Sequence, residues 1–189
     1  MALIRPCLTA LWAAFFAFPA QAFVLGGGIV QQSGSGAFVK LDPADGFAVG
    51  ADTFDTDDLY AFDEDQNITL IEPIRVDISP DGRGFVPAGS IVASHYVFFD
   101  SINGIQYGYV DFDAPILGVA AFQDTMAATD FLANTSVTYI SLELRGLERG
   151  DQVWIDQADP HRLWVYWAGS SPGDFIRVFT AQSSAAPLM

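Results

Sequence analysis

The sequence predicts an all-β fold, a single-domain antiparallel β-sandwich of jelly-roll-like organisation, and three observations point to it. Apolar and polar residues alternate with a period of two through much of the chain after residue 90, as they do in strands that bury one face. Gly, Pro, Asn and Asp cluster at short intervals between these stretches, where turns are needed. The length of 189 residues fits one domain with a self-sufficient hydrophobic core.

The expected elements are short strands and one short helix. After a Gly- and Ser-rich start with one strand near Ile29–Gln31, an acid-dense region holds only brief apolar runs. The helix is expected at Thr125–Ala133, with Asp124 as its N-cap. Strands are expected at about residues 90–99, 106–112, 115–122, 136–142, 151–156, 162–168 and 174–180.

The dipeptide Asn103-Gly104 predicts a hairpin between the first two of these strands. Asn-Gly is the strongest two-residue hairpin signal, because both residues tolerate positive φ. The turn would place Phe98 opposite Tyr109, and it would place His95 on an apolar face as a hydrogen-bonded core residue. A slip of one residue would scatter the apolar set, which favours this register.

A second hairpin is predicted through the loop at residues 157–161. If Asp156 pairs with Arg162, one face of the hairpin is apolar and points to the core. That face consists of Val153, Ile155, Leu163 and Val165. The opposite face carries the rings of Trp154, Trp164 and Tyr166, with Gln152, Asp156 and Arg162 as a polar rim.

These three rings are the strongest indication of a function. Aromatic faces stack on the apolar faces of sugar rings, and the flat faces of β-sandwiches suit such platforms. The sequence therefore predicts a carbohydrate-binding surface at Trp154, Trp164 and Tyr166. The alternative is that the rings are simply buried, as aromatic side chains usually are, and solvent exposure distinguishes the two.

Residues 1–22 have the pattern of a secretory signal peptide. Arg5 precedes an apolar stretch, Leu8–Phe18, that is too short to span a bilayer, and Ala20-Gln21-Ala22 matches a cleavage pattern. We expect a mature chain that begins at Phe23, is extracellular or periplasmic, and does not insert into a membrane. Cleavage would remove the single cysteine, so neither a disulfide nor a thiolate ligand is expected.

The chain therefore divides into three predicted parts. Residues 1–22 are the signal peptide, residues 23–180 the β-sandwich domain, and residues 181–189 a disordered tail of small and polar residues.

Acidic residues dominate the charge of the chain. There are 23 Asp and Glu residues against 8 Lys and Arg residues, which gives a formal net charge of -15. Nucleic-acid phosphates and anionic lipid headgroups repel such a chain. The composition therefore excludes nucleic acid as a partner.

The acid-dense region contains a candidate calcium site. Asp63, Asp65 and Asn67 have the alternate spacing that opens a calcium-binding loop. Asp55 and Asp57 add carboxylates nearby, and calcium would relieve the repulsion among so many acids. The loop pattern then fails, because isoleucines stand where the Gly of the turn and the closing Glu are needed. The alternative is an acidic, solvated loop that keeps the protein soluble.

No catalytic residues are assigned. Residues 169–173 match the G-x-S-x-G nucleophile elbow, but the residue after the central serine is Pro172, which has no N–H to offer an oxyanion hole. A tight turn between two strands explains the motif. A pair of carboxylates acting as in glycosidases stays open, because such pairs are defined by their separation in space.

Several segments are similar to those of a known group of proteins. They are Leu59–Asn67, Ala93–Asp100, Asp111–Gly118, Arg145–Glu148 and Ser171–Asp174. Over roughly residues 45–180 the chain resembles uncharacterised exported bacterial β-rich proteins, many of which carry a PEP-CTERM-type sorting tail. The resemblance implies export and a β-rich domain, and it assigns no functional residue. This chain departs from the sorted members, because its last residues lack a hydrophobic span and a basic terminus.

Together these features favour a secreted, non-enzymatic β-sandwich that acts as an extracellular or cell-surface binding or matrix module. The expected partner is a polysaccharide or another matrix component. Two alternatives stay open, a carboxylate-dependent hydrolase similar to glycosidases and a structural protein stabilised by Ca²⁺.

Overall fold

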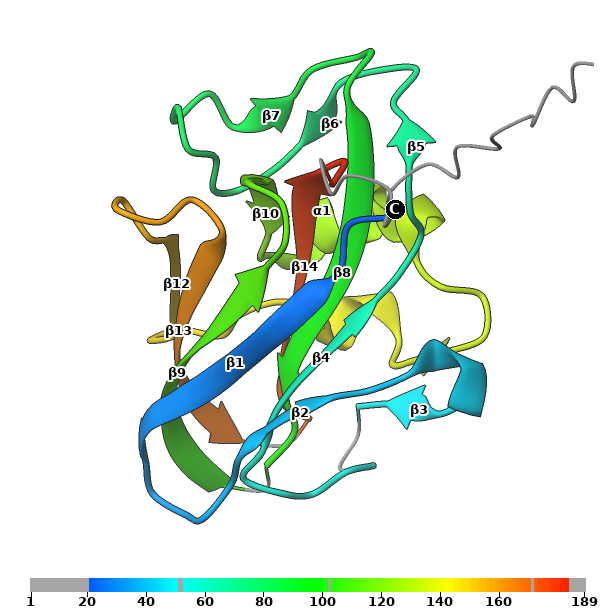
Figure 1. The fold of residues 1–189 in the computed structure, drawn as a ribbon. Coiled ribbons are helices and arrows are strands. Elements are labelled where there is room, and N and C mark those ends of the chain that lie inside the picture. Colours follow the sequence, from blue (N-terminus) through cyan, green and yellow to red (C-terminus); the bar gives the residue numbers. More distant parts are fainter. Residues whose placement is uncertain (1–20, 51–52, 102, 171, 184–189) are drawn as a thin grey trace, which may run out of the picture.

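The protein is an all-β sandwich, as predicted. A computed structural model describes residues 21–50, 53–101, 103–170 and 172–183. Two main sheets, one of four strands and one of six, form the fold (Figure 1). Residues 1–20 of the predicted signal peptide and residues 184–189 of the predicted tail lie outside the described residues.

The four-stranded sheet is antiparallel throughout, with the strand order β1-β9-β13-β12. Its strands are β1 (Val24–Gln32), β9 (Asn103–Phe112), β13 (Arg162–Ser170) and β12 (Gln152–Ile155). The predicted hairpin of residues 151–168 is confirmed here, since Trp154 pairs with Trp164 and the amide of Asp156 donates to the carbonyl of Arg162.

The six-stranded sheet has the order β10-β14-β8-β4-β2, and a short strand, β5, also pairs with β8. Its strands are β10 (Ile116–Ala120), β14 (Asp174–Ala181), β8 (Ile91–Phe99), β4 (Leu59–Asp63), β2 (Phe38–Lys40) and β5 (Ile68–Thr69). Only the pair of β2 and β4 in this sheet is parallel. The last residue of β14, Ala181, is the first residue of the predicted tail.

Smaller elements cover the outer face of the six-stranded sheet. Two strand pairs are present, β3 (Ala48–Val49) with β11 (Thr138–Tyr139), and β6 (Ile74–Arg75) with β7 (Phe85–Val86). The helices are α1 (Gln123–Ala128) and the 3-10 turns η1 (Pro43–Asp45), η2 (Asp130–Leu132) and η3 (Leu142–Leu144). The predicted helix is thus divided into α1 and η2, and its N-cap is Phe122, where Asp124 was expected.

The hydrophobic core lies on both faces of the six-stranded sheet. Between the two sheets, Val97 and Phe99 of β8 pack with Trp167 of β13. On the other face, Tyr96 and Phe98 pack under the smaller elements. A strand covered on both faces has an apolar sequence with little alternation, and all residues of β8 after Ile91 are buried.

The predicted hairpin at Asn103-Gly104 is wrong. The strands β8 and β9 belong to different sheets, so that Phe98 pairs with Tyr60 and Phe175, and Tyr109 pairs with Gly28 and Trp164. The reason is burial. β8 needs cover on both of its faces, whereas β9 alternates and buries only one, and two such strands cannot be neighbours in one sheet without exposing the second apolar face of β8.

Candidate functional site

The outer face of the four-stranded sheet carries five aromatic rings from three adjacent strands. Residues that pair directly across antiparallel strands share a face. The register therefore places Tyr109, Trp164 and Trp154 in one row across the sheet, and Tyr107 and Tyr166 in the next row. We call these five residues the aromatic face.

Three of the rings are close and nearly parallel. The ring centroids of Tyr107 and Trp164 lie 5.2 Å apart, those of Trp154 and Trp164 lie 6.3 Å apart, and those of Tyr107 and Trp154 lie 6.0 Å apart. Their planes differ by only 14 to 25°. Such offset arrangements are the preferred geometry of aromatic neighbours, so the rings hold one another in a common orientation.

Polar contacts fix the edge of the aromatic face. Arg162 binds the carboxylate of Asp111 in a bidentate manner, through Nε at 2.7 Å and Nη2 at 2.8 Å, and this pairing raises the pKa of Arg162. The guanidinium carbon lies 4.0 Å from the centroid of the Tyr109 ring. The indole N–H of Trp164 donates to Asp156 at 2.7 Å, and this hydrogen bond lowers the pKa of the Asp156 carboxyl.

The aromatic face meets solvent only in part. Trp154 on the edge strand β12 is 37% exposed, and the other four rings are half-buried. On the neighbouring strand β1 this face is formed by Gly26 and Gly28, which pair with Asp111 and Tyr109. A Cβ atom added to Gly26 would meet no atom within 4 Å, whereas one added to Gly28 would lie 3.0 Å from the Tyr109 side chain, so the surface beside the rings is open at Gly26 only.

The sequence identified Trp154, Trp164 and Tyr166 but missed Tyr107 and Tyr109. Both tyrosines lie in the strand expected at residues 106–112, which the Asn103-Gly104 signal wrongly pairs with the strand at 90–99. The signal that could have found them is the alternation in β9, where residues 106, 108, 110 and 112 are buried and residues 107, 109 and 111 are not.

The residues of the predicted calcium site are not brought together. Asp55 and Asp57 precede β4, whereas Asp63 ends it, and the five residues of this strand correspond to about 16 Å of extended chain. Asp57 accepts hydrogen bonds from the hydroxyl of Ser101 at 3.2 Å and the amide of Ser35 at 3.3 Å. Across the described ranges of the chain, no group of three or more His, Cys, Asp or Glu side chains is arranged to hold a metal ion.

Asp63 is engaged with other partners. It binds Lys40 and the Nδ1 atom of His95, each at 2.8 Å. Burial opposes ionisation of the Asp63 carboxyl, but the hydrogen bonds from His95 and Lys40 leave its pKa below the usual value. The other two predicted ligands, Asp65 and Asn67, lie between β4 and β5, where the backbone of Asn67 has a positive φ of 57°.

His95 is a hydrogen-bonded core residue, as predicted. Its Nε2 atom lies 2.9 Å from the hydroxyl of Thr180, so that Asp63, His95 and Thr180 form a chain of acid, imidazole and hydroxyl. The same order of groups occurs in catalytic triads. Here His95 and Thr180 are both fully buried, which keeps a substrate from the hydroxyl. These two hydrogen bonds therefore connect β4, β8 and β14.

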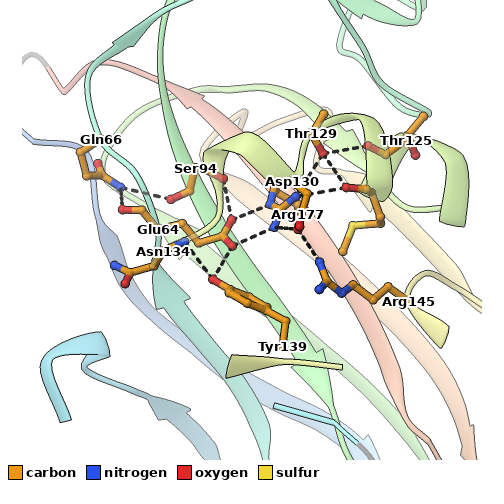
Figure 2. Close-up of polar contacts among 11 residues, drawn as sticks. Glu64, Gln66, Ser94, Thr125, Thr129, Asp130, Asn134, Tyr139, Arg145 and Arg177 are labelled. Atoms are coloured by element: carbon orange, nitrogen blue, oxygen red, sulfur yellow. Dashed lines mark hydrogen bonds and ion pairs between the residues drawn. The ribbon is translucent and has the colours of Figure 1, made fainter. Parts of the chain in front are cut away.

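A second buried network joins Glu64 to Arg177 beneath α1 (Figure 2). The carboxylate of Glu64 accepts from Nε of Arg177 at 2.7 Å and Nη2 at 3.0 Å, from the hydroxyl of Ser94 at 2.6 Å and from that of Tyr139 at 2.7 Å. Arg177 also contacts Asp130, which in turn binds Arg145. Neither side chain of the Glu64–Arg177 pair is exposed, so this ion pair lies inside the fold, where each charge depends on its partners.

Two carboxyl groups meet where β14 begins. Burial, followed by repulsion from Asp151, raises the pKa of Asp174 to about 9. The Asp151 carboxylate accepts from the amides of Ala168 at 2.9 Å and Glu148 at 2.8 Å. Paired acids of this kind serve as general acids in some hydrolases, but Asp174 is only 2% exposed and out of reach of a substrate.

Comparison of the chain with family models, with curated proteins and with solved structures finds no match. No helix among the described residues is long and apolar enough to cross a membrane.

Proposed function

We propose that this protein is an exported binding module that holds a neutral polysaccharide on its aromatic face. The observation that carries the proposal is the set of five rings on one outward sheet face, with Trp154 partly exposed and three rings nearly parallel. Export is proposed from the sequence pattern of residues 1–22.

A sugar suits this surface better than a purely apolar partner. Sugar rings combine apolar C–H faces with a rim of hydroxyl groups, so they need aromatic surface and hydrogen-bonding groups side by side. The aromatic face supplies the first, and the flanking side chains of Gln152, Asp156 and the Asp111–Arg162 pair supply the second.

Charge favours a neutral ligand. The chain has a formal net charge of -15, and the cation at the aromatic face, Arg162, is already neutralised by Asp111. An anionic polymer would therefore be repelled over the range of the Debye length.

The two rows of rings favour a sugar chain that runs across the strands. From Trp154 on β12 to Gly28 on β1 the row crosses three strand spacings, about 14 Å. The Tyr109 ring lies over Gly28, whereas the surface at Gly26 is open, so the sugar chain can continue past Tyr109 over Gly26.

The test is retention of the purified domain on insoluble neutral polysaccharides, namely cellulose, chitin, mannan and a β-1,3-glucan, with alginate as an anionic comparison. We expect retention on at least one neutral polymer and at least tenfold weaker binding for Trp154→Ala. The matched control is Phe131→Ala, which removes an aromatic ring that is 61% exposed on η2 and should leave binding unchanged. Absence of retention on every neutral polymer, or equal binding by Trp154→Ala, would overturn the proposal.

A further inference from the structure

The start of the folded domain is fixed by a carboxylate. The backbone nitrogen of Phe23 donates to Oδ1 of Asp113 at 2.8 Å, and the amide of Asp113 donates back to the carbonyl of Phe23 at 3.1 Å. The next residue, Val24, is buried and pairs with Phe112 in the sheet. The position of the Phe23 nitrogen is therefore set by the fold itself.

Asp113 has a second oxygen whose partner is missing. Its Oδ2 atom is buried and has no hydrogen-bond partner within the described part of the chain. A buried carboxylate oxygen without a donor is costly, because its lost hydration is not replaced. The two oxygens of one carboxylate are about 2.2 Å apart, so a group that contacts Oδ1 and carries more than one N–H can serve both.

The charges around this point do not balance. Lys40 lies 2.8 Å from Asp63, and its ammonium group is 5.4 Å from the centroid of the Phe23 ring. Asp63 also accepts a hydrogen bond from the amide of Val24, at 2.8 Å. Lys40 and Asp63 neutralise each other, and among the described residues Asp113 forms no ion pair with a Lys or Arg side chain.

We propose that the chain is processed by hydrolysis of the Ala22–Phe23 peptide bond, and that the new α-ammonium group of Phe23 forms an ion pair with Asp113. Water adds across the C–N bond, so that Ala22 leaves as a carboxylate and Phe23 gains the ammonium. This group carries three N–H donors at the nitrogen that already binds Oδ1, and it supplies the cation that Asp113 lacks. The inference rests on the proposed export, since a leader peptidase is the catalyst.

Processing must precede folding. Ala22 is only 1% exposed and packs against Ala93 and Ala114, so a peptidase cannot draw the folded segment into an active site. Cleavage gives up the contacts of this one methyl group and gains an ion pair. The folded precursor should therefore resist the peptidase, whereas the newly translocated chain is cut.

The first test is the mass of the protein recovered after export from a bacterial host that expresses the full chain. We expect a mass that corresponds to a chain beginning at Phe23. Retention of the leader, or a chain that begins at another residue, would overturn the assigned site. This result is independent of polysaccharide binding, so the two proposals fail separately.

The second test measures the ion pair in a chain that begins at Phe23, released from a fusion without extra residues. The pKa of the α-amine, followed by ¹⁵N NMR, should lie about one unit above the ordinary value of about 7.7–8.0, and Asp113→Asn should abolish this rise. Acetylation of the amine should lower Tm by about 2–4 °C in the unsubstituted chain and have no effect in Asp113→Asn. A chain beginning at Ala22, with the ammonium one residue away, is the matched control. An ordinary α-amine pKa that is insensitive to Asp113→Asn would refute the pair, and the acetylation arm decides the matter if the variant does not fold.

Discussion

The substitution Glu64→Gln tests whether the buried network of Figure 2 carries a large part of the stability. Glu64 accepts four hydrogen bonds, two of them from Arg177, and both side chains are fully buried. Glutamine has nearly the same shape, so the change removes the charge without opening a cavity. Arg177 then keeps only Asp130 as a charged partner, at 3.3 Å.

The expected cost is large, because the substitution leaves a buried cation poorly compensated. Removal of one partner of a buried ion pair costs about 3–5 kcal/mol, which is a substantial fraction of the roughly 5–15 kcal/mol that stabilises a typical domain. For a chain of this size we expect Tm to fall by about 6–20 °C.

The assay is equilibrium unfolding in urea together with thermal unfolding followed by circular dichroism. The matched control is Glu72→Gln, which neutralises an exposed acid and should change the free energy of unfolding by less than about 0.5 kcal/mol. If Glu64→Gln were as mild as Glu72→Gln, the argument that Arg177 depends on Glu64 would be refuted.

Three further predictions address pH, metal and ligand. Because the pKa of Asp174 is raised, the folded chain keeps a proton that the unfolded chain releases near pH 4. The wild type should therefore lose stability as pH rises from about 4 to about 9, by at most about 1.4 kcal/mol per pH unit. Asp174→Asn should flatten the dependence of Tm on pH. Parallel curves for the two proteins would contradict this. Millimolar calcium should shift Tm by less than about 1 °C, because Asp57 and Asp63 already bind protein donors, and a clear rise would support the calcium site predicted from the sequence. Gly26→Gln should leave Tm nearly unchanged, since its Cβ meets open space and the amide adds no charge opposite Asp111, but should weaken binding of long sugar chains more than of disaccharides in a competition assay.

The sequence predicts well those features that depend on local pattern. The hairpin of β12 and β13 has the expected register because its two faces differ sharply, with Val153 and Val165 inward and Trp154 and Trp164 outward. The strand positions in the second half of the chain also agree, although the stretch at 136–142 contributes only the two residues of β11.

Sheet membership could not be derived in the same way. The signal at Asn103-Gly104 describes a local turn, whereas the partner of β8 is decided by the need to cover both of its faces. This tertiary requirement separated β8 from β9 and brought Tyr107 and Tyr109 onto the aromatic face. The acidic residues illustrate the same limit, because the spacing of Asp57 and Asp63 gives no sign that β4 holds them apart.

The double burial of β8 has a consequence for cooperativity. This strand contributes Phe98 to one apolar compartment and Val97 to the other, and β14 divides Phe175 and Ile176 in the same way. Because β8 and β14 separate the two core clusters, neither cluster can be exposed to solvent without exposing the other. Partial unfolding would therefore lose the packing of both clusters while it releases the entropy of only part of the chain. The domain should therefore melt in a single transition whose calorimetric and van't Hoff enthalpies agree. The amides of β8 and β14 should exchange with deuterated solvent only through global unfolding.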